Sequence, residues 1–386
     1  MSLSNQYAIV GVSETDWSRD SGRTPHTLAL QAVTRALDDA GLRPGDVDGI
    51  LSYSEMDSSD PVDVANGVGI RPNMYAEILG GGSSTEYLIG SAIGSIEAGM
   101  CDTVVIFRAM NGRSGVRMGT DAMTSAPFPG GEFMLPYGFL SPAQMFSLMA
   151  HKHMEVYGTT KEHLAAVALT FRENANRNPR AFFHDRPLTL DEYRNARVIS
   201  WPFQLYDCCL EVDGANALVV TSLDRARHLR RTPVKIRAVA GRVTKDKGDF
   251  LQDPDFTASA GKYVAPRIYR QAGVGPGDID VAAIYDCFSF TVITQLEDYG
   301  FVGKGEGGPF VADGNVRMGG TLPINTAGGM LSEAYTHGMN NVVELVRQLR
   351  HEYDGEDRQV KDAEIGLATG WATPAICSGM ILERDR

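Results

Sequence analysis

Two side chains that can exchange protons stand two residues apart in the stretch "SEAYTHGMNN", residues 332–341. The stretch follows the pair Gly328 and Gly329 and leads into a run with helical apolar spacing, which predicts the first turn of a helix. Free amides and the positive dipole end of a helix N-terminus favour the ionised form of a nearby acid. Tyr335 or His337 is therefore expected to act as an acid or a base. Taken alone, the stretch favours the histidine, because imidazole titrates near neutral pH.

Composition narrows the class of protein that could carry this pair. The chain has 386 residues, enough for about two domains or one large duplicated domain. A formal net charge of −12 argues against a general nucleic-acid surface, which needs clustered Lys and Arg. No apolar run approaches the roughly 20 residues that span a bilayer, and the N-terminus lacks signal-peptide features, so we expect a cytoplasmic protein. The five cysteines follow no disulfide or zinc spacing, which predicts reduced thiols and no metal.

The chain contains an internal repeat. The segments "AGLRPGDVDGI", from Ala40, and "AGVGPGDIDVAAI", from Ala272, are similar in sequence. Each follows a predicted amphipathic helix, at 26–39 and 262–271, and leads through a Pro-Gly-Asp turn into an apolar strand. One such turn could recur by chance, but the matching residues on both sides indicate duplication.

Further strands and helices alternate along both copies, which predicts a layered α/β fold. Strands are expected at 8–12, 103–107, 217–221, 234–240, 365–368 and 376–382, and helices at 84–98, 291–299 and 337–349. Residues 124–201 are mostly helical, with Pro and Gly breaks, and are predicted to form an inserted lobe over the substrate pocket. We therefore divide the chain into a first half (1–123 and 202–241), the inserted loop domain (124–201) and a second half (242–386).

The duplicated halves contain two stretches, "EVDGANALVVTS" at 211–222 and "DCFS" at 286–289. Through the halves and these two stretches, the chain resembles the thiolase superfamily over essentially its whole length. The nearest branch is similar to the sterol-carrier-protein thiolases, or lipid-transfer proteins. The resemblance implies an α/β thiolase fold, with two duplicated βαβαβαββ halves in a layered α-β-α-β-α arrangement and an inserted helical loop domain.

The residues that thiolases use for Claisen chemistry are all replaced. The slot of the nucleophilic cysteine falls in "LGGGSSTEYL" on Thr85 or an adjacent serine, Ser83 or Ser84. Tyr285, in "IYDCFSF", takes the place of one family histidine, and Tyr335 takes the place of the second when the sequences are aligned on the double glycine. The second family cysteine falls in "TGWAT", residues 369–373, which contains none.

Two tyrosines in the histidine slots resemble one subgroup, the thiolase-fold aldolases that shorten steroid side chains. The matching motifs are "YDxF", "GFxGKGE" (300–306), "PINTxGG" (323–329) and "EAYxHGMN" (333–340). The resemblance implies retro-aldol cleavage of a β-hydroxyacyl-CoA to a ketone and a shorter acyl-CoA. It also implies a homodimer formed through sheet edges and a partner with an OB-fold and zinc ribbon that helps bind CoA. No cofactor or metal is implied, since CoA is part of the substrate.

Such a cleavage needs a base at the hydroxyl, an acid at the α-carbon and stabilisation of the enolate. We assign Tyr335 as the base, with its pKa lowered at the helix N-terminus, and Tyr285 as the acid or the donor to the enolate; the reverse assignment stays open. The backbone amides at Gly81 and Gly82, or at Gly328 and Gly329, are candidates for the oxyanion site. The supporting residues expected around the pair are His337, Asp286 and Thr85.

Two other functions stay open at this stage. One is a cysteine-less thiolase or condensing enzyme with a Ser or Thr nucleophile, and the other is a non-catalytic subunit that binds acyl-CoA or lipid. The sequence leaves open the ring system of the substrate, an acetyl-CoA or a propionyl-CoA product, and activity without the partner. Three arginines in the glycine-rich stretch 108–119 are expected in a loop, either solvated, at the dimer contact or at the acyl-CoA pocket.

Overall fold

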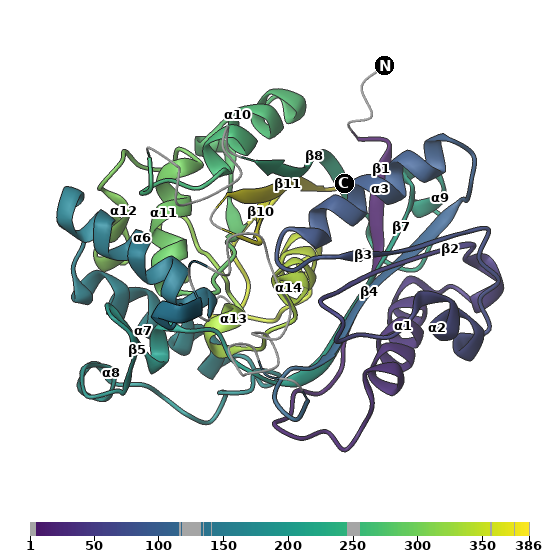
Figure 1. Cartoon of the computed structure of the whole chain (residues 1–386). Helices are drawn as coiled ribbons and strands as arrows, with labels where there is room; N and C mark the ends of the chain where they lie inside the picture. The colour runs from purple at the N-terminus through teal and green to yellow at the C-terminus, as the bar shows by residue number, and fades with distance from the viewer. Residues whose placement is uncertain are drawn as a thin grey trace.

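A nine-stranded mixed sheet runs through the molecule in the order β3-β2-β4-β7-β1-β8-β11-β10-β9 (Figure 1). The computed structural model describes residues 5–115, 117, 133, 135–139, 141–244, 255–355, 357–373 and 375–385. The strands of this sheet are β1 (Tyr7–Glu14), β2 (Gly49–Ser54), β3 (Met74–Leu79), β4 (Thr103–Asn111), β7 (Asp213–Ser222), β8 (Val234–Thr244), β9 (Val281–Ala283), β10 (Ile365–Trp371) and β11 (Ile376–Arg384).

Helices lie on both faces of this sheet. They are α1 (Pro25–Ala40), α2 (Pro61–Val68), α3 (Ser84–Glu97), α6 (Pro142–Tyr157), α7 (Lys161–Arg177), α8 (Leu190–Arg194), α9 (Leu223–Ala226), α10 (Gly261–Ala272), α11 (Ser289–Asp298), α12 (Gly307–Ala312), α13 (Gly329–Ser332) and α14 (Met339–Arg350). Two short strands, β5 (Val198–Ser200) and β6 (Phe203–Gln204), form a separate hairpin. In the part of the chain that the structure describes, no helix is long and apolar enough to cross a bilayer.

The sheet confirms the duplication. The two copies have the same strand order, read from opposite edges of the sheet toward its centre. It is β3-β2-β4-β7-β1 in the first copy. In the second copy an isolated parallel bridge at Ile324 takes the place of β3, and β9-β10-β11-β8 follow. In both copies the inner strands pair in parallel and the last two pair antiparallel, as β4 with β7 and β10 with β11. The two copies meet where β1 pairs with β8.

The two Pro-Gly-Asp segments form matching local structures, as predicted. Helix α1 begins with Thr24, whose side chain accepts a hydrogen bond from the Thr27 amide, and ends at Gly41 with a φ of 73°. Helix α10 ends in the same way at Gly273, with a φ of 67°. These left-handed positions favour glycine because a Cβ would strain the backbone. Each Pro-Gly-Asp then forms one 3-10 turn before the next strand, at Pro44–Asp46 and Pro276–Asp278.

Successive side chains of each strand point to opposite faces of the sheet and pack into different hydrophobic clusters. Three such clusters separate the layers of the fold. On β1, Ala8 and Val10 pack with α1, whereas Tyr7 and Ile9 face the cluster that contains α3 and α14. The second half contributes its other face to a third cluster with α10 and α11. Figure 1 shows α3 and α14 in the middle, α1 and α2 on one side and α11 on the other. The result is the expected α-β-α-β-α arrangement.

The inserted segment between β4 and β7 carries α6, α7, α8 and the β5-β6 hairpin, and it packs on the second half. Asp207 anchors it: its carboxylate accepts hydrogen bonds from Ser289 Oγ at 2.6 Å and Tyr193 Oη at 2.6 Å, and from Lys161 Nζ at 3.1 Å. Because Ser289 opens α11, the lobe is fixed directly to the element that follows Tyr285. Part of the predicted lobe, 124–132, lies outside the described residues.

The division into domains stays a proposal, and the sheet suggests one change to it. Strand β8 occupies in the second copy the place that β1 occupies in the first, since both lie at the centre of the sheet. We propose that the second half begins before β8, near residue 233, instead of at 242.

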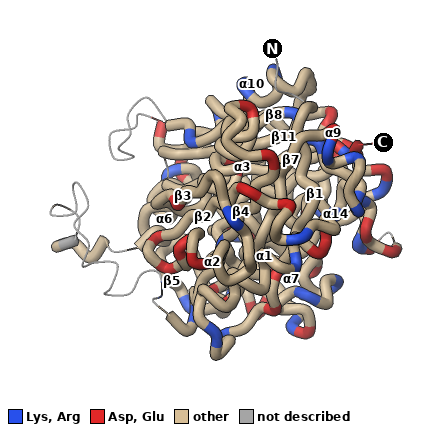
Figure 2. Tube along the Cα trace, turned by 90° about the vertical axis from the view of Figure 1, so that its right-hand side faces the viewer, with Lys and Arg blue, Asp and Glu red and all other residues tan. Residues whose placement is uncertain are grey.

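Figure 2 shows the face that carries β2, β3 and α2, with Lys and Arg intermixed with Asp and Glu among mostly uncharged residues. Apolar side chains lie exposed at this edge of the sheet. On the edge strand β3, Tyr75 is 60% exposed and Leu79 is 70% exposed. A parallel edge strand with exposed apolar side chains can pair with another chain.

Candidate active site

Tyr285 lies in the segment that follows β9, and hydrogen bonds on both sides of its peptide fix its backbone. Its amide donates to Thr369 Oγ1 at 2.9 Å, and its carbonyl accepts from Gln295 Nε2 at 2.7 Å and Thr291 Oγ1 at 3.0 Å. These partners come from β10 and from α11. The position of the phenol is therefore set by two neighbouring elements of the second half.

Two asparagines from the recognised motifs hold the same segment from the other side. The Asn325 side chain donates to the Ile284 carbonyl and accepts from the Ile284 amide, both at 2.8 Å. Asn341 Nδ2 donates to Asp286 Oδ1 at 2.9 Å. The motif "PINTxGG" and the asparagine directly after "EAYxHGMN" therefore support the placement of Tyr285.

The helix predicted at 337–349 is confirmed as α14, but it begins at Met339, so the prediction that Tyr335 and His337 lie in its first turn was wrong. Helix α13 ends at Ser332 and α14 begins at Met339, which leaves Tyr335 and His337 in the connection between them. Left-handed backbone at His337 (φ 53°) and Gly338 (φ 86°) interrupts the helical path. In the sequence, the apolar spacing of α14 continues into this connection. The backbone of the connection nevertheless leaves the helical conformation.

The connection brings Tyr335 against Tyr285, and the two phenols are hydrogen-bonded to each other. Both are buried, with 2% of Tyr285 and 6% of Tyr335 exposed. The first half closes over them through Gly82: a Cβ added there would lie 2.1 Å from Tyr285 Oη. The structure therefore brings together the two tyrosine slots and the glycine turn that precedes α3.

Electrostatics at the pair differ from the prediction that a helix N-terminus lowers the pKa of Tyr335. Burial raises the pKa of Tyr335 well above its ordinary value, and Cys209 and Glu55 add to the effect. Burial likewise raises the pKa of Tyr285. The two phenols also affect each other's pKa through their mutual hydrogen bond. Both phenols are therefore neutral at pH 7.

Among the described residues, no carboxylate or imidazole is hydrogen-bonded to the hydroxyls in the slot of the thiolase nucleophile. Thr85 Oγ1 is buried and hydrogen-bonded to Tyr53 Oη at 2.8 Å, and Ser84 Oγ accepts from Arg242 Nη2 at 2.9 Å. Ser83 Oγ has no hydrogen-bond partner among the described residues. An unactivated hydroxyl is a poor nucleophile, because activation requires an adjacent base.

The four glycines predicted for the oxyanion site fall into two places. Gly81 and Gly82 lie with the tyrosines and His337, since a Cβ on Gly81 would be 3.2 Å from His337 Nε2. A Cβ on Gly329 would instead meet Asp286 Oδ2 at 2.3 Å, and one on Gly328 would meet the Ala175 Cβ at 2.6 Å. Only the first pair faces the phenols through its contacts.

Asp286 is fully buried behind the tyrosines and holds the connection in place. Its Oδ2 accepts from the Leu331 amide at 3.0 Å, in the short helix α13. Burial raises its pKa to about 6, and hydrogen bonds to the carboxylate oppose that rise. The contacts tie the Tyr285 segment to both helices that flank Tyr335.

His337 stacks beside Tyr335, with 4.9 Å between ring centroids at a tilt of 55°. Its Nδ1 lies 3.2 Å from Nε of Arg108, which lies within β4 and is fully buried. The expectation that Arg108 belongs to a loop was therefore wrong, because β4 runs on through Asn111. Sequence reasoning named Arg108 only as one of three arginines that could reach the acyl-CoA pocket, and it missed Asp57. A signal for Arg108 was its place directly after the apolar run "TVVIF".

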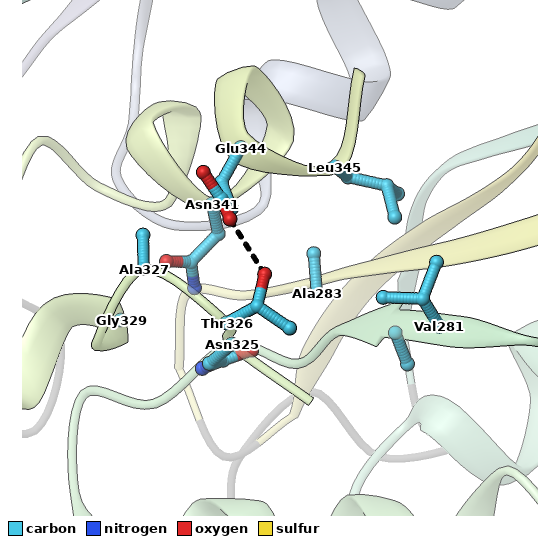
Figure 3. A pocket seen from close by; sticks show the side chains of 10 residues that line it. Val281, Ala283, Asn325, Thr326, Ala327, Gly329, Asn341, Glu344 and Leu345 are labelled. Carbon is cyan, nitrogen blue, oxygen red and sulfur yellow. Dashed lines mark hydrogen bonds between the residues drawn. The ribbon is translucent and has the colours of Figure 1, made fainter. Parts of the chain in front are cut away.

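A small cavity of about 10 Å³ lies on the other side of the supporting asparagines (Figure 3). Asn325, Gly329 and Asn341 line it together with Thr326 and Glu344, and Thr326 Oγ1 donates to Glu344 Oε1 at 2.6 Å. This volume admits about one water molecule. The cavity therefore belongs to the support of the site and does not hold an acyl-CoA.

The described residues contain no group of three or more His, Cys, Asp or Glu side chains that could hold a metal ion.

Strand order, duplication and a site at the meeting of the two halves define a thiolase-fold protein whose Claisen residues are replaced. A family profile described as "Thiolase C-terminal domain-like" matches residues 243–384. The chain is 40% identical over 390 residues to the 17-hydroxy-3-oxo-4-pregnene-20-carboxyl-CoA lyase of Mycobacterium tuberculosis, covering 98% of this chain and 100% of the relative. It is 38% identical over 388 residues to the steroid side-chain-cleaving aldolase of Thermomonospora curvata, covering 98% of each.

A solved structure described as "Ltp2-ChsH2(DUF35) aldolase" superposes on the whole chain with a TM-score of 0.92 and 38% identity, covering 100% of both. The chain belongs to the thiolase superfamily and, within it, to the family of these aldolases.

Proposed function

We propose that the chain cleaves a ring-bearing β-hydroxyacyl-CoA by a retro-aldol reaction, giving a ketone and a shorter acyl-CoA such as propionyl-CoA. The name of the M. tuberculosis relative describes such a substrate, since its hydroxyl is on C17 and its thioester carbon is attached to C20. The hydroxyl is therefore β to the thioester. Cleavage between C17 and C20 leaves a 17-ketone and a three-carbon acyl-CoA.

The observation that carries this proposal is the buried, hydrogen-bonded pair Tyr285 and Tyr335 in the slots that thiolases give to histidines. A Claisen reaction needs a nucleophile, and the hydroxyls at residues 83–85 have no base beside them in the described residues. A retro-aldol reaction needs proton transfer only, which two phenols supply.

We assign Tyr335 as the base and Tyr285 as its hydrogen-bonded partner. Tyr335 takes the proton of the substrate hydroxyl and, because it is itself neutral, releases its own proton to the developing enolate in the same step, while it stays hydrogen-bonded to Tyr285. Because burial opposes a free phenolate, this transfer accompanies carbon–carbon cleavage. The O–H and C–C bonds break, the oxygen pair forms the ketone, and the C–C pair forms the enolate of the thioester. The proton returns to the α-carbon, so the reaction is redox-neutral and needs no cofactor beyond the CoA of the substrate.

We propose that the chain works as a homodimer and with an OB-fold and zinc-ribbon partner that helps bind CoA. The exposed apolar side chains of edge strand β3 support the dimer. The aligned solved structure is that of an aldolase described with a DUF35 component, which supports a partner of that kind.

The test incubates the chain, with and without the partner, with a tertiary β-hydroxyacyl-CoA that bears a ring. Ketone and shorter acyl-CoA should appear in equal amounts without added free CoA. Cleavage that requires free CoA would indicate thiolysis, and binding without products by the complete complex would indicate a non-catalytic subunit.

Tyr285→Phe and Tyr335→Phe should each lower kcat by about 10² to 10⁴ while acyl-CoA binding is kept. Tyr157→Phe is the matched control, because Tyr157 is 38% exposed on α6 and should leave kcat unchanged. Full activity of both buried-tyrosine variants would contradict the assigned roles.

A further inference from the structure

Arg108 is a buried cation whose side chain divides its hydrogen bonds between a carboxylate and a histidine. Its Nη2 lies 2.7 and 2.6 Å from the two oxygens of Asp57, and its Nη1 donates to the Ala109 carbonyl at 2.9 Å. Its Nε and Nη2 lie 3.2 and 3.1 Å from Nδ1 of His337. Within this arrangement the guanidinium is neutralised by Asp57 and still faces the imidazole.

The contact determines which nitrogen of His337 carries the proton. A guanidinium has donors only, so Nδ1 of His337 has to accept. A neutral imidazole that accepts at Nδ1 carries its hydrogen on Nε2. Arg108 therefore selects one tautomer of His337.

The Nε2 edge of the ring points to the reacting side of the site. A Cβ on Gly81 would lie 3.1 Å from Cδ2 and 3.2 Å from Nε2 of His337, so the ring edge lies against the glycine turn. The opposite neighbour is Tyr335, whose ring centroid is 4.9 Å away. The left-handed backbone of His337, with a φ of 53°, is part of how the ring reaches this place.

Charges around the imidazole keep it neutral. Burial and the charge of Arg108 lower the pKa of His337 well below its ordinary range, whereas Asp57 raises it. The other ionisable groups that face the ring are Glu55, whose Oε1 would lie 2.9 Å from a Cβ on Gly81, and the phenols Tyr53 and Tyr335. A neutral ring at working pH can donate through Nε2 but cannot act as a cationic acid.

We propose that Arg108 is a positioning residue that fixes His337 as a neutral donor whose Nε2–H binds the enolate oxygen of the substrate. This deepens the proposed retro-aldol function and rests on it for the identity of the oxygen. The absence of a Cβ on Gly81 lets the glycine turn lie against the Nε2 edge of His337. Donors placed where negative charge develops are among the largest contributions to catalysis.

The first test reads the tautomer directly and needs no activity. The chain contains eight histidines, and ¹⁵N-histidine labelling with a His337→Gln spectrum for assignment identifies the signals of His337. The wild type should show a protonated Nε2 and a bare Nδ1 from pH 5 to pH 8. A proton on Nδ1 would overturn the proposal.

Removing Arg108 alone would leave the half-buried Asp57 without its partner and empty the fully buried site of the guanidinium, and could prevent folding. The paired variant Arg108→Met/Asp57→Asn removes both charges together. Its His337 signals should show a mixture of tautomers and a titration that moves toward the ordinary range. Unchanged signals in the folded paired variant would show that Arg108 does not position the ring.

The second test reads the donor itself. The amide nitrogen of Gln reaches about the position of Nε2, whereas that of Asn reaches about the position of Nδ1. His337→Gln should keep kcat within about tenfold of wild type, and His337→Asn should lose about 10² to 10³, a typical loss for one oxyanion donor. Equal activity of the Asn variant and the wild type would overturn the donor role while the retro-aldol function stands. If the wild type cleaves nothing, the proposed function fails and the tautomer test still decides the role of Arg108.

Discussion

Gly82 gives the sharpest test of the geometry around the tyrosine pair. A Cβ at this position would lie 2.0 Å from Cζ and 2.1 Å from Oη of Tyr285, whereas ordinary contacts begin at 3.4 Å. In Gly82→Ala the phenol therefore has to move by about 1.4 Å, the difference between 3.4 and 2.0 Å. Gly82 is not among the residues with positive φ, so the contact alone is the perturbation.

The size of the effect follows from that displacement. A reacting group misplaced by about 1 Å can lower a rate by about 10²-fold, so kcat of Gly82→Ala should fall by about that factor or more. The added methyl should also lower the free energy of unfolding by about 1 to 3 kcal/mol through overpacking. Because the fold has other sources of stability, the variant should remain folded.

The assay measures ketone release under saturating substrate, together with urea unfolding followed by circular dichroism. Gly94→Ala is the matched control: it lies on α3, the helix that follows Gly82, and a Cβ there would meet no atom within 4 Å. It should keep kcat and gain about 0.5 to 1 kcal/mol of stability. If Gly82→Ala were as active as Gly94→Ala, the close approach of Tyr285 to the glycine turn would not matter for the reaction.

Three further outcomes are expected. Asn325→Ala should lose about 1 to 3 kcal/mol of unfolding free energy in a urea titration. The reason is that the buried Ile284 amide loses its acceptor, while the Ile284 carbonyl keeps its hydrogen bond from Asn341. An unchanged midpoint would show that the Asn325 side chain is not needed to hold Ile284. Burial raises the pKa of Glu86 from 4.5 to about 7, so the folded state holds this proton more tightly and wild-type stability falls as the pH rises from 4.5 to 7. Glu86→Gln should therefore gain up to about 3 kcal/mol relative to wild type across that range, and a difference independent of pH would contradict the cause. Leu79→Lys on β3 should convert a dimer to monomers in light scattering, whereas a persisting dimer would place the contact elsewhere.

The sequence predicted the layers because their determinants are local. The Pro-Gly-Asp turns, the glycines at helix ends and the apolar strands occur in both copies within short segments, and each formed the expected element. Tyr285 and Tyr335 were found through the resemblance, since a tyrosine on an apolar element is usually only a core residue. The structure adds that they are partners of one hydrogen bond.

The charged support of His337 could not be predicted, because it depends on contacts between residues far apart in the chain. Arg108 and His337 are separated by 229 positions, and their meeting depends on how the two halves pack. The predicted start of α14 was wrong for another reason: the apolar spacing of this helix continues toward its N-terminus into a segment whose backbone turns left-handed at His337 and Gly338. Periodicity reports which side chains are buried and does not report φ.

The meeting of the two copies at one site has a consequence for how this chain can vary. The first copy supplies Gly82 and Arg108, and the second supplies Tyr285, Tyr335 and His337. Neither copy alone holds a complete set. A single copy that forms a dimer with itself would therefore need all five residues in one sequence. A substitution in the outer helix α1 or α10 affects contacts within one copy. A substitution at any of these five positions requires a compensating substitution in the other copy.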